Sequence, residues 1–450
     1  MASGVSGSRA DRFMNKAWLE ALFEWRAVRW LAGAAFMARA AGWAVVGRPY
    51  RALVDVCWVA RVSNVAPWRG LAESIVFRIV DRVKRTGRNP AIDWYRADGA
   101  SRECAHLFSL TGRGSADLLR DLIVLKSPSD REKGVILLKY ARTFSAVVAL
   151  LDLERLMDRY QFVLEPCWAG YCDPALLLFV TASQPVVVQC FTHSDHEFVR
   201  RLGYPMIPVR LGPADWVDAD AFDLPQVPEK QFDLVMVANW APHKRHALLF
   251  KALQSLGDRD VRVLLVGFPW ADRSADDVRR EVAAFPNDRV SVRIVEQVPH
   301  AELARLLRQC KVFVFLSKKE GDNKALVEAM FAGVPAIVYD RTVGGASSRI
   351  NAATGVLAAE RELPEKIRYM LDHHMEFSPR QWALEHTGAK VATRLVDNAL
   401  REAALRSGGD YRSGIVEKIN APNLAYKVAS DRERFRADYD FALSCRLAAR

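Results

Sequence analysis

Short apolar runs recur along the chain, and stretches with helical periodicity follow them. Val312–Leu316 reads VFVFL, a continuously apolar segment typical of a buried strand in a parallel sheet. Lys324–Ala332 consists of good helix formers, Gly333 is placed to end that helix, and Pro335 prevents its continuation. Ala336–Tyr339 is then expected to form the next strand. In an open α/β sheet, the loop between such a strand and its helix lies at the carboxyl edge, where ligands bind.

Alternating strand and helix signals cover most of the chain from residue 115 onwards. Leu122–Lys126, the loop Ser127–Lys133 and the segment opened by Gly134 are expected to form the first βα unit. Further strands are expected at Phe162–Glu165, Pro185–Phe191, Phe232–Ala238, Val261–Val266 and Ser291–Val295. Further helices are expected at Asp152–Tyr160, from Asp173 onwards, and at His246–Ser255, Ser274–Ala284, His300–Gln309, Glu362–His373 and Gln381–Leu405. Helices that alternate with parallel strands make a doubly wound α/β fold.

The chain has 450 residues, which is too long for a single core and favours roughly two to three domains. The expected division is a helical amino-terminal region at 1–114, an α/β domain at 115–225, a second α/β domain at 226–405, and a tail at 406–450 with a helix at Asp431–Leu447. A proline-containing linker at Leu224–Lys230 is expected to join the two α/β domains.

The composition is that of a folded protein, since 50% of the residues are hydrophobic and 26% are charged. The seven cysteines are scattered and odd in number, and none has the spacing of a zinc site. They are therefore expected to be reduced thiols of a cytosolic protein. Met1–Lys16 is polar and small, without the apolar core of a secretory signal peptide.

The amino-terminal region concentrates positive charge and tryptophan. Residues 1–94 hold 15 lysines and arginines against 7 aspartates and glutamates, a net charge of +8 out of +11, and 7 of the 12 tryptophans. Leu31–Val46 is apolar apart from Arg39, but its 16 residues are short for a bilayer span of about 20. Two interpretations stay open: a surface that lies on an anionic membrane, or a helical subdomain packed on the rest of the chain with its arginines in water. Nucleic acid is not expected as a partner, because no recognised binding motif is present.

Two glutamates bracket the loop and the helix that follow the first strand described above. Glu320 lies at the end of the strand and Glu328 inside the helix, followed by Ala329-Met330 and Gly333-Val334-Pro335. This pattern resembles the signature of the retaining glycosyltransferases of the GT-B fold, family 4 type, which are bacterial glycosyl transferases group 1 with nucleotide-sugar donors. The resemblance implies two Rossmann-like domains facing a cleft, with Glu320 on the donor sugar and Glu328 on the ribose hydroxyls. A carboxylate suits these tasks because it accepts charge-assisted hydrogen bonds from a vicinal diol.

The resemblance covers Phe232–Leu357 strongly and Leu122–Phe222 faintly. In the family an arginine and a lysine neutralise the departing diphosphate. Lys244 falls on the lysine position, whereas Asn239 replaces the arginine and Arg245 replaces a glycine; we hypothesise that Arg245 supplies the missing cation. Besides Glu320, the implied catalytic residues are Lys244 and His193. Besides Glu328, the implied donor-binding residues are Asn239, Arg245, Gly134, Gly267, Gln297, Asn323 and Lys324.

The implied reaction moves a sugar from a nucleotide diphosphate to an acceptor hydroxyl with retention, in glycan, polysaccharide or glycolipid synthesis. No metal and no cofactor is expected: Asp218-Ala219-Asp220 has the form of a metal motif of another sugar-transferase fold, but its place at the crossover between domains favours a structural role. The expected partners are a nucleotide sugar and a glycan or lipid-linked acceptor, with the protein in the cytoplasm or at the inner face of the plasma membrane. Two alternatives stay open, a non-catalytic nucleotide-sugar-binding scaffold and a nucleotide-sugar epimerase. For His193 a plain loop residue, and for Gly134 an ordinary turn glycine, also stay open.

Overall fold

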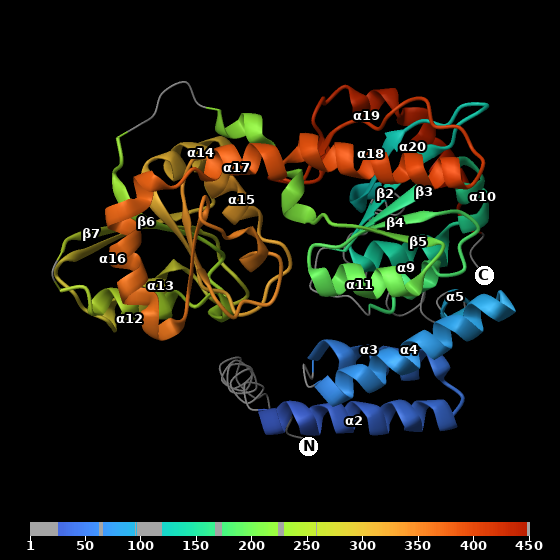
Figure 1. Cartoon of the computed structure of the whole chain (residues 1–450), viewed down its shortest axis with the longest axis horizontal. Helices are drawn as coiled ribbons and strands as arrows, with labels where there is room; N and C mark the ends of the chain where they lie inside the picture. The colour runs from blue at the N-terminus through green and yellow to red at the C-terminus, as the bar shows by residue number, and fades with distance from the viewer. Residues whose placement is uncertain are drawn as a thin grey trace, which may run out of the picture.

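The computed structural model describes residues 26–62, 66–94, 96, 119–166, 173–223, 229–257 and 259–447. Predictions for the first 25 residues, for residues 97–114 and for most of the linker at 224–230 lie outside the described residues. The described chain forms two α/β domains beside each other, and a group of helices covers one side of the first domain (Figure 1). The predicted fold class, two Rossmann-like sheets with a helical amino-terminal region, is confirmed.

The second domain is built on six parallel strands in the order β11-β10-β9-β6-β7-β8. They are β6 (Phe232–Val237), β7 (Val261–Gly267), β8 (Val290–Glu296), β9 (Cys310–Phe315), β10 (Ala336–Tyr339) and β11 (Gly355–Ala358). The chain winds outward from β6 to β8 and then from β9 to β11, which is the doubly wound order. The topological switch point, where ligands bind in such sheets, therefore lies between β6 and β9.

Helices cover both faces of this sheet, because its central strands are buried and apolar on both sides. They are α12 (His246–Gln254), α13 (Ala275–Ala283), α14 (His300–Arg308), α15 (Lys324–Phe331), α16 (Leu363–His373) and α17 (Pro379–His386). One core contains α12, α13 and α16, and the other contains α14 and α15. The predicted bounds of α12 to α16 are correct to within one residue. The single helix expected at Gln381–Leu405 is instead two, α17 and α18 (Ala389–Arg406), separated at Thr387 and Gly388.

The first domain holds five strands in the order β1-β2-β3-β4-β5. They are β1 (Leu122–Lys126), β2 (Gly134–Lys139), β3 (Tyr160–Glu165), β4 (Val186–Gln189) and β5 (Met206–Val209). β1 is antiparallel to β2, and the other pairs are parallel. The expected βα unit is therefore wrong, because the segment opened by Gly134 is the strand β2, which pairs directly with β1. A Cβ at Gly134 would lie 2.7 Å from the carbonyl oxygen of Lys126 and 2.6 Å from the ring of Tyr160, so close strand packing explains this glycine.

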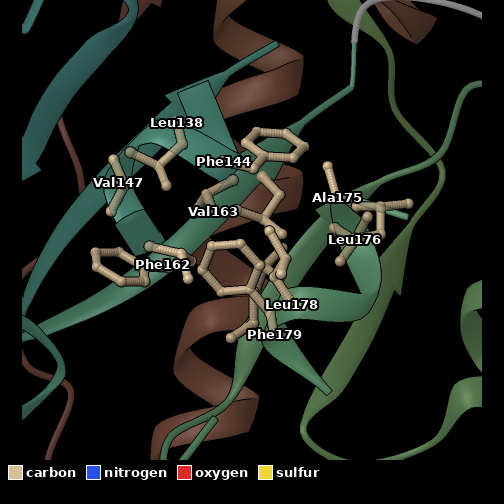
Figure 2. Packing of buried hydrophobic residues seen from close by; sticks show 14 of the residues in the cluster. Leu138, Phe144, Val147, Phe162, Val163, Ala175, Leu176, Leu178 and Phe179 are labelled. Carbon is tan, nitrogen blue, oxygen red and sulfur yellow. The ribbon is translucent and has the colours of Figure 1, made fainter. Parts of the chain in front are cut away.

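The strands of the first sheet follow one another in sequence order, so their crossover helices lie on one face. Figure 1 shows α9 (Ala141–Leu150) and α11 (His193–Leu202) on that face and α18, which returns from the second domain, on the other. α10 (Leu153–Arg159) leads into β3. Figure 2 shows the apolar core of the domain, where the ring of Phe179 meets Phe144 and Phe162 edge to face at 6.3 and 6.2 Å. Phe179 ends η3 (Leu176–Phe179), a short 3-10 helix in place of the helix expected from Asp173.

The tail packs on the first domain. It contains β12 (Lys418–Ile419), β13 (Ala425–Tyr426), α19 (Asp431–Arg434) and α20 (Arg436–Ser444), so the helix expected at Asp431–Leu447 is two short helices. Lys418 is fully buried and donates to Glu165 at the end of β3, 2.6 Å away. Asn420 donates to the other oxygen of Glu165 at 2.8 Å and accepts from Lys139 at 3.0 Å. Burial alone would raise the pKa of Glu165, but the two lysines hold it below its ordinary value.

The amino-terminal region consists of α2 (Arg26–Val45), α3 (Pro49–Val62), α4 (Ala66–Thr86) and α5 (Pro90–Trp94), which confirms the helical prediction for the described residues. α4 lies against α11 of the first domain. The rings of Phe77 and Phe198 are 5.3 Å apart, and Arg201 pairs with Glu73 at 3.0 Å. The region is thus a subdomain packed on the first domain. Among the helices that the structure describes, none is both long enough and apolar enough to cross a membrane.

Two segments cross between the α/β domains, and one buried guanidinium binds both. η4 (Pro213–Trp216) follows β5 on the way out, and the chain returns at Thr387 before α18. Arg349 of the second domain donates to Asp215 of η4 at 2.7 Å, and Asp215 also accepts from Thr387 at 2.5 Å. Arg349 reaches the two oxygens of Asp322 at 3.0 and 2.8 Å. Burial alone would raise the pKa of Asp215, but Arg349 and Thr387 hold it below its ordinary value.

Replacement of Arg349 by methionine should lower the free energy of unfolding by about 3–5 kcal/mol, because two buried carboxylates lose their common partner. Urea denaturation followed by circular dichroism measures the change. Arg361→Met is the matched control, since Arg361 is exposed, and its effect should stay within about 0.5 kcal/mol. If Arg349→Met lowers the unfolding free energy no more than Arg361→Met does, other contacts hold the domain junction.

Candidate active site

The candidate site lies at the carboxyl edge of the second sheet, at its switch point. Lys244 closes η6 (Pro242–Lys244), which follows β6, and Glu320 lies in the loop after β9. Because β6 and β9 are neighbours in the sheet, the two loops meet. The ammonium of Lys244 contacts Glu320 Oε1, and Asn323 Nδ2 donates to Glu320 Oε2 at 3.1 Å. The structure therefore brings three of the predicted site residues together.

The loop that carries Glu320 is held by the loop after β10. The amide of Glu320 donates to the carbonyl oxygen of Val343 at 2.9 Å, and the amide of Gly345 donates to that of Gly321 at 3.0 Å. Gly344 has a φ of 141°, and a Cβ there would lie 2.2 Å from the carbonyl oxygen of Glu320. Only glycine permits this approach. The glycine pair thus fixes the backbone of Glu320.

The amino terminus of α15 begins next to the Glu320 carboxylate. Asn323 caps the helix, because its Oδ1 accepts from the amide of Leu326 at 2.8 Å while its Nδ2 holds Glu320. Amides in the first turn of a helix carry partial positive charge and bind anions. A phosphate group is the kind of ligand that this helix start accommodates.

Lys244 is buried, and burial lowers its pKa to about 8. The neighbouring carboxylate of Glu320 favours the ammonium form. At neutral pH the side chain is therefore mainly a cation. Glu320 neutralises it, and an anionic ligand can take over that role.

Glu328 lies inside α15 and is buried. Its Oε1 is 3.0 Å from Nε2 of His300, the first residue of α14. The His300 ring packs edge to face on Phe222, with 5.6 Å between centroids. Phe222 thus fixes the plane of the imidazole, and the imidazole holds the carboxylate of Glu328.

Arg245 follows Lys244 in the left-handed conformation, with a φ of 66°, which a glycine adopts more readily. Its guanidinium pairs with Glu360, donates to the carbonyl oxygen of Leu316 at 3.4 Å and lies 4.8 Å from the ring centroid of Tyr339. These partners stand at the carboxyl ends of β11, β9 and β10. Arg245 therefore lies along the same edge of the sheet as Lys244.

Asn239, Gly267 and Gln297 lie at the carboxyl ends of β6, β7 and β8. Asn239 Oδ1 accepts from the amide of Ala241 at 3.3 Å, which shapes the turn into η6. The amide of Gln297 donates to the carbonyl oxygen of Gly267 at 2.9 Å, and Gln297 has a φ of 53°. These bonds order the backbone around Gln297, one of the predicted donor-binding residues.

Three of the predicted site residues, Lys324, His193 and Gly134, do not contribute a side chain next to Glu320. Lys324 Nζ donates to the carbonyl oxygen of Asn420 in the tail at 2.8 Å, so its backbone amide, and not its ammonium, is the candidate donor contact. His193 is exposed and begins α11 in the first domain, which corrects the plain-loop alternative. Gly134 lies at the amino-terminal edge of the first sheet, opposite to the carboxyl ends of its parallel strands. The loop at the carboxyl end of β2 contains Tyr140, with a φ of 71°.

The Asp218-Ala219-Asp220 sequence is bound by the tail. Asp218 caps η5 (Ala219–Phe222) by accepting from the amide of Asp220 at 3.1 Å. Lys427 pairs with both carboxylates. These contacts support the structural interpretation of this motif.

The sequence analysis missed His300 and Asp322. His300 opens a predicted helix whose start lies near the ligand edge, which is a usable signal for a site histidine. Asp322 stands between Glu320 and Asn323 and binds Arg349, which also binds Asp215. These partners are remote from Asp322 in sequence. Only packing of the two domains shows that contact.

The comparison with known families concerns the second α/β domain, which holds this cluster. Residues 219–382 match the family Glycosyl transferases group 1. The matched segment contains the whole Lys244–Glu320–Asn323 cluster.

Relatives of the chain match only part of it. A GDP-mannose:cellobiosyl-diphosphopolyprenol alpha-mannosyltransferase of Komagataeibacter xylinus is 30% identical over 193 residues, which are 39% of this chain and 49% of the relative. The chain thus matches about half the length of that protein. A solved glycosyltransferase of Rickettsia africae ESF-5 is 16% identical, over 59% of this chain and 76% of that chain, with a TM-score of 0.47. HepE of Anabaena with UDP and glucose is 14% identical, over 59% and 78%, with a TM-score of 0.46.

The stability of the protein should report the titration of Lys244. Burial lowers the pKa of this side chain from 10.5 to about 8, so between these values the unfolded chain binds more protons and native stability rises with pH. Below pH 8 the cost of the buried ammonium is fully present. The unfolding free energy of the native protein minus that of Lys244→Met should therefore increase by roughly 1–3 kcal/mol as the pH rises from 8 to 10.5.

Urea denaturation at a series of pH values tests this expectation. Lys251→Met removes an exposed lysine of α12 and is the matched control. The unfolding free energy of the native protein minus that of Lys251→Met should stay constant over the same pH range. A flat difference for Lys244→Met would mean that Glu320 compensates the effect of burial.

Proposed function

We propose that the protein is a retaining glycosyltransferase that moves a hexosyl unit from a nucleotide diphosphate sugar to an acceptor hydroxyl. The contact of Lys244 and Asn323 with Glu320, inside the segment that matches Glycosyl transferases group 1, is the observation that carries the proposal. A cation, a carboxylate and a helix amino terminus meet there. They suit the diphosphate and the hydroxyl groups of a nucleotide sugar.

In the proposed reaction Glu320 orients the donor sugar and Glu328 binds the ribose hydroxyls. Donor binding exchanges the contact between Lys244 and Glu320 for contacts with the donor, since the ammonium turns to the phosphates and the carboxylate to the sugar. Lys244, Arg245 and the amides at the start of α15 then stabilise the leaving diphosphate. Catalysis of this kind consists mostly of positioning and electrostatic stabilisation. The two side-chain cations take the role that a metal ion has in other sugar transferases.

The acceptor in this proposal is a glycan or a lipid-linked glycan. The relative from Komagataeibacter xylinus is named for transfer from GDP-mannose to cellobiosyl-diphosphopolyprenol, a glycan on a lipid diphosphate. We assign the acceptor to the first domain, where His193 begins α11 and is exposed. Its imidazole can donate to or accept from a hydroxyl group.

A non-catalytic nucleotide-sugar-binding scaffold is the second candidate, and one observation favours it. Asn239 stands at the position of the family's arginine, and its side chain forms the turn before η6. Asparagine cannot compensate the charge of a departing diphosphate. Release of nucleotide diphosphate separates an enzyme from a scaffold, and a requirement for an acceptor separates a transferase from an epimerase.

A panel of nucleotide diphosphates and their sugars, measured by thermal shift and calorimetry, tests the proposed function. One nucleotide sugar should stabilise the native protein, by about 2.7 kcal/mol at 100 times its Kd. Glu328→Ala should weaken its binding roughly 10- to 100-fold, because charge-assisted hydrogen bonds are lost. Glu365→Ala removes an exposed carboxylate of α16 and should change nothing. If no ligand of the panel stabilises the protein, the donor assignment is wrong; a ligand that binds without turnover supports the scaffold.

His300 should act as a positioning residue for Glu328. His300→Ala removes the ring that holds the carboxylate, so the Kd of the nucleotide diphosphate should rise roughly 5- to 10-fold. His300→Asn keeps a polar group near Glu328 and should recover part of the affinity. In the Glu328→Ala background, His300→Ala should have no further effect. Additive losses in the double variant would contradict an action through Glu328.

A further inference from the structure

The outward face of α2 is uncharged over most of its length. Gly33 and Ala40 are buried on the opposite face, which packs on α3 and α4. Leu31 is 63% exposed and Val45 is 87% exposed. Helical spacing places five exposed residues on one stripe: Leu31, Ala35, Ala38, Gly42 and Val45. A helix face that meets water normally carries polar residues, so this face is suited to contact with an apolar partner.

Large exposed apolar side chains also stand at the two ends of α2. Trp30 is exposed at the edge where α2 meets α4, since its ring lies 5.4 Å from that of Trp68, and Val46 is exposed just after the helix. Figure 1 shows α2 as the outermost helix, with α3 and α4 between it and the first domain. The outward face of α2 is thus directed away from the body of the protein. No other described part of the chain buries it.

Arginine stands at the two ends of α2. Arg26 begins α2 and Arg48 follows its last turn, and both are exposed. The guanidinium of Arg48 lies 5.8 Å from the ring centroid of Trp43. Between these ends Arg39 is turned to α3, where it binds the two oxygens of Asp55 at 2.7 and 2.6 Å. Cations therefore lie at the ends of the apolar face and not across it.

We propose that α2 lies in the headgroup layer of an anionic membrane, with its uncharged face towards the acyl chains. An interfacial helix has this arrangement, in which an apolar face is bordered by arginine and tryptophan at the polar boundary. Residues 26–94 hold 12 basic and 4 acidic residues, which complements anionic lipid. The same charge opposes the approach of a second copy through this face. A membrane surface is therefore the occupant that both the apolar face and its charge favour.

The consequence for catalysis rests on the proposed function. α4 joins the helices to α11 through the Phe77–Phe198 contact and the Arg201–Glu73 pair, so α2 sets the orientation of the first domain. That domain, to which we assign the acceptor, is the α/β domain next to the helical layers (Figure 1). A lipid-linked acceptor then reaches the protein without leaving the membrane surface.

Sedimentation of the full chain with vesicles, without any sugar nucleotide, tests the membrane proposal separately from the proposed function. The native chain should bind vesicles of equal parts phosphatidylcholine and phosphatidylglycerol, and bind phosphatidylcholine alone far less. The double variant Ala35→Glu with Ala38→Glu should lower the partition coefficient at least roughly tenfold, because two carboxylates enter the contact with anionic lipid. Arg26→Gln with Arg48→Gln should lower binding to the anionic vesicles by about fivefold per removed charge.

Leu405→Glu is the matched control, since Leu405 is 59% exposed on α18, on the other face of the first sheet, and its partition should equal that of the native chain. The changed positions of α2 are exposed, so thermal unfolding of the variants should match the native protein. Absence of native binding to either vesicle, or equal binding of the glutamate variant, overturns the proposal. Light scattering measures the oligomeric state. If the native chain is a dimer and the glutamate variant is a monomer, the face binds a second copy and the membrane proposal is wrong.

Discussion

The buried guanidinium of Arg349 joins both chain crossovers to the loop of the candidate site. Asp215 belongs to the segment that leaves the first domain, and Thr387 to the segment that returns to it. Asp322 stands two positions after Glu320 and binds the same guanidinium through both of its oxygens. Charge-assisted bonds to a planar guanidinium are directional. Contacts at the junction between the domains therefore fix the position of the loop from Glu320 to Lys324.

The tail holds the other end of this loop. Lys324 donates to the carbonyl oxygen of Asn420, and the side chain of Asn420 is bound to Glu165 in the first sheet. The loop from Glu320 to Lys324 is thus held within the second domain by Arg349 and by the loop after β10, and Lys324 ties it to the tail, which packs on the first domain. A rotation of one domain against the other must change these contacts. Domain closure and the geometry around Glu320 are for this reason coupled mechanically, as hinge motions commonly are when a ligand loop lies at the hinge.

The accuracy of the sequence predictions follows the range of the interactions that decide each element. In the second domain β6, β9 and β10 are short apolar runs, and β8 alternates apolar and polar residues, so the local pattern is enough to predict them. The segment from Gly134 becomes a strand only because β1 and β3 flank it, and no local pattern shows those partners. Lys418 is buried against Glu165, 253 positions earlier, so the place of the tail depends on a contact that spacing cannot reveal. In the site, the family resemblance finds Lys244, Glu320 and Asn323, which follow the neighbouring strands β6 and β9. It misses His300, whose contact with Glu328 depends on how α14 packs beside α15.

The two departures from the family pattern, Asn239 and Arg245, are explained better together than separately. A residue other than glycine in the left-handed region costs on the order of 1–3 kcal/mol, and such strain persists only where the surroundings fix it. Arg245 is fixed by Glu360, by a backbone carbonyl and by the ring of Tyr339, all at the ligand edge of the sheet. The loop between β6 and α12 therefore keeps two adjacent cations at this edge, Lys244 and Arg245, although it lacks the arginine at 239. In the proposed reaction this second cation helps to stabilise the leaving diphosphate, a role that the scaffold alternative does not need.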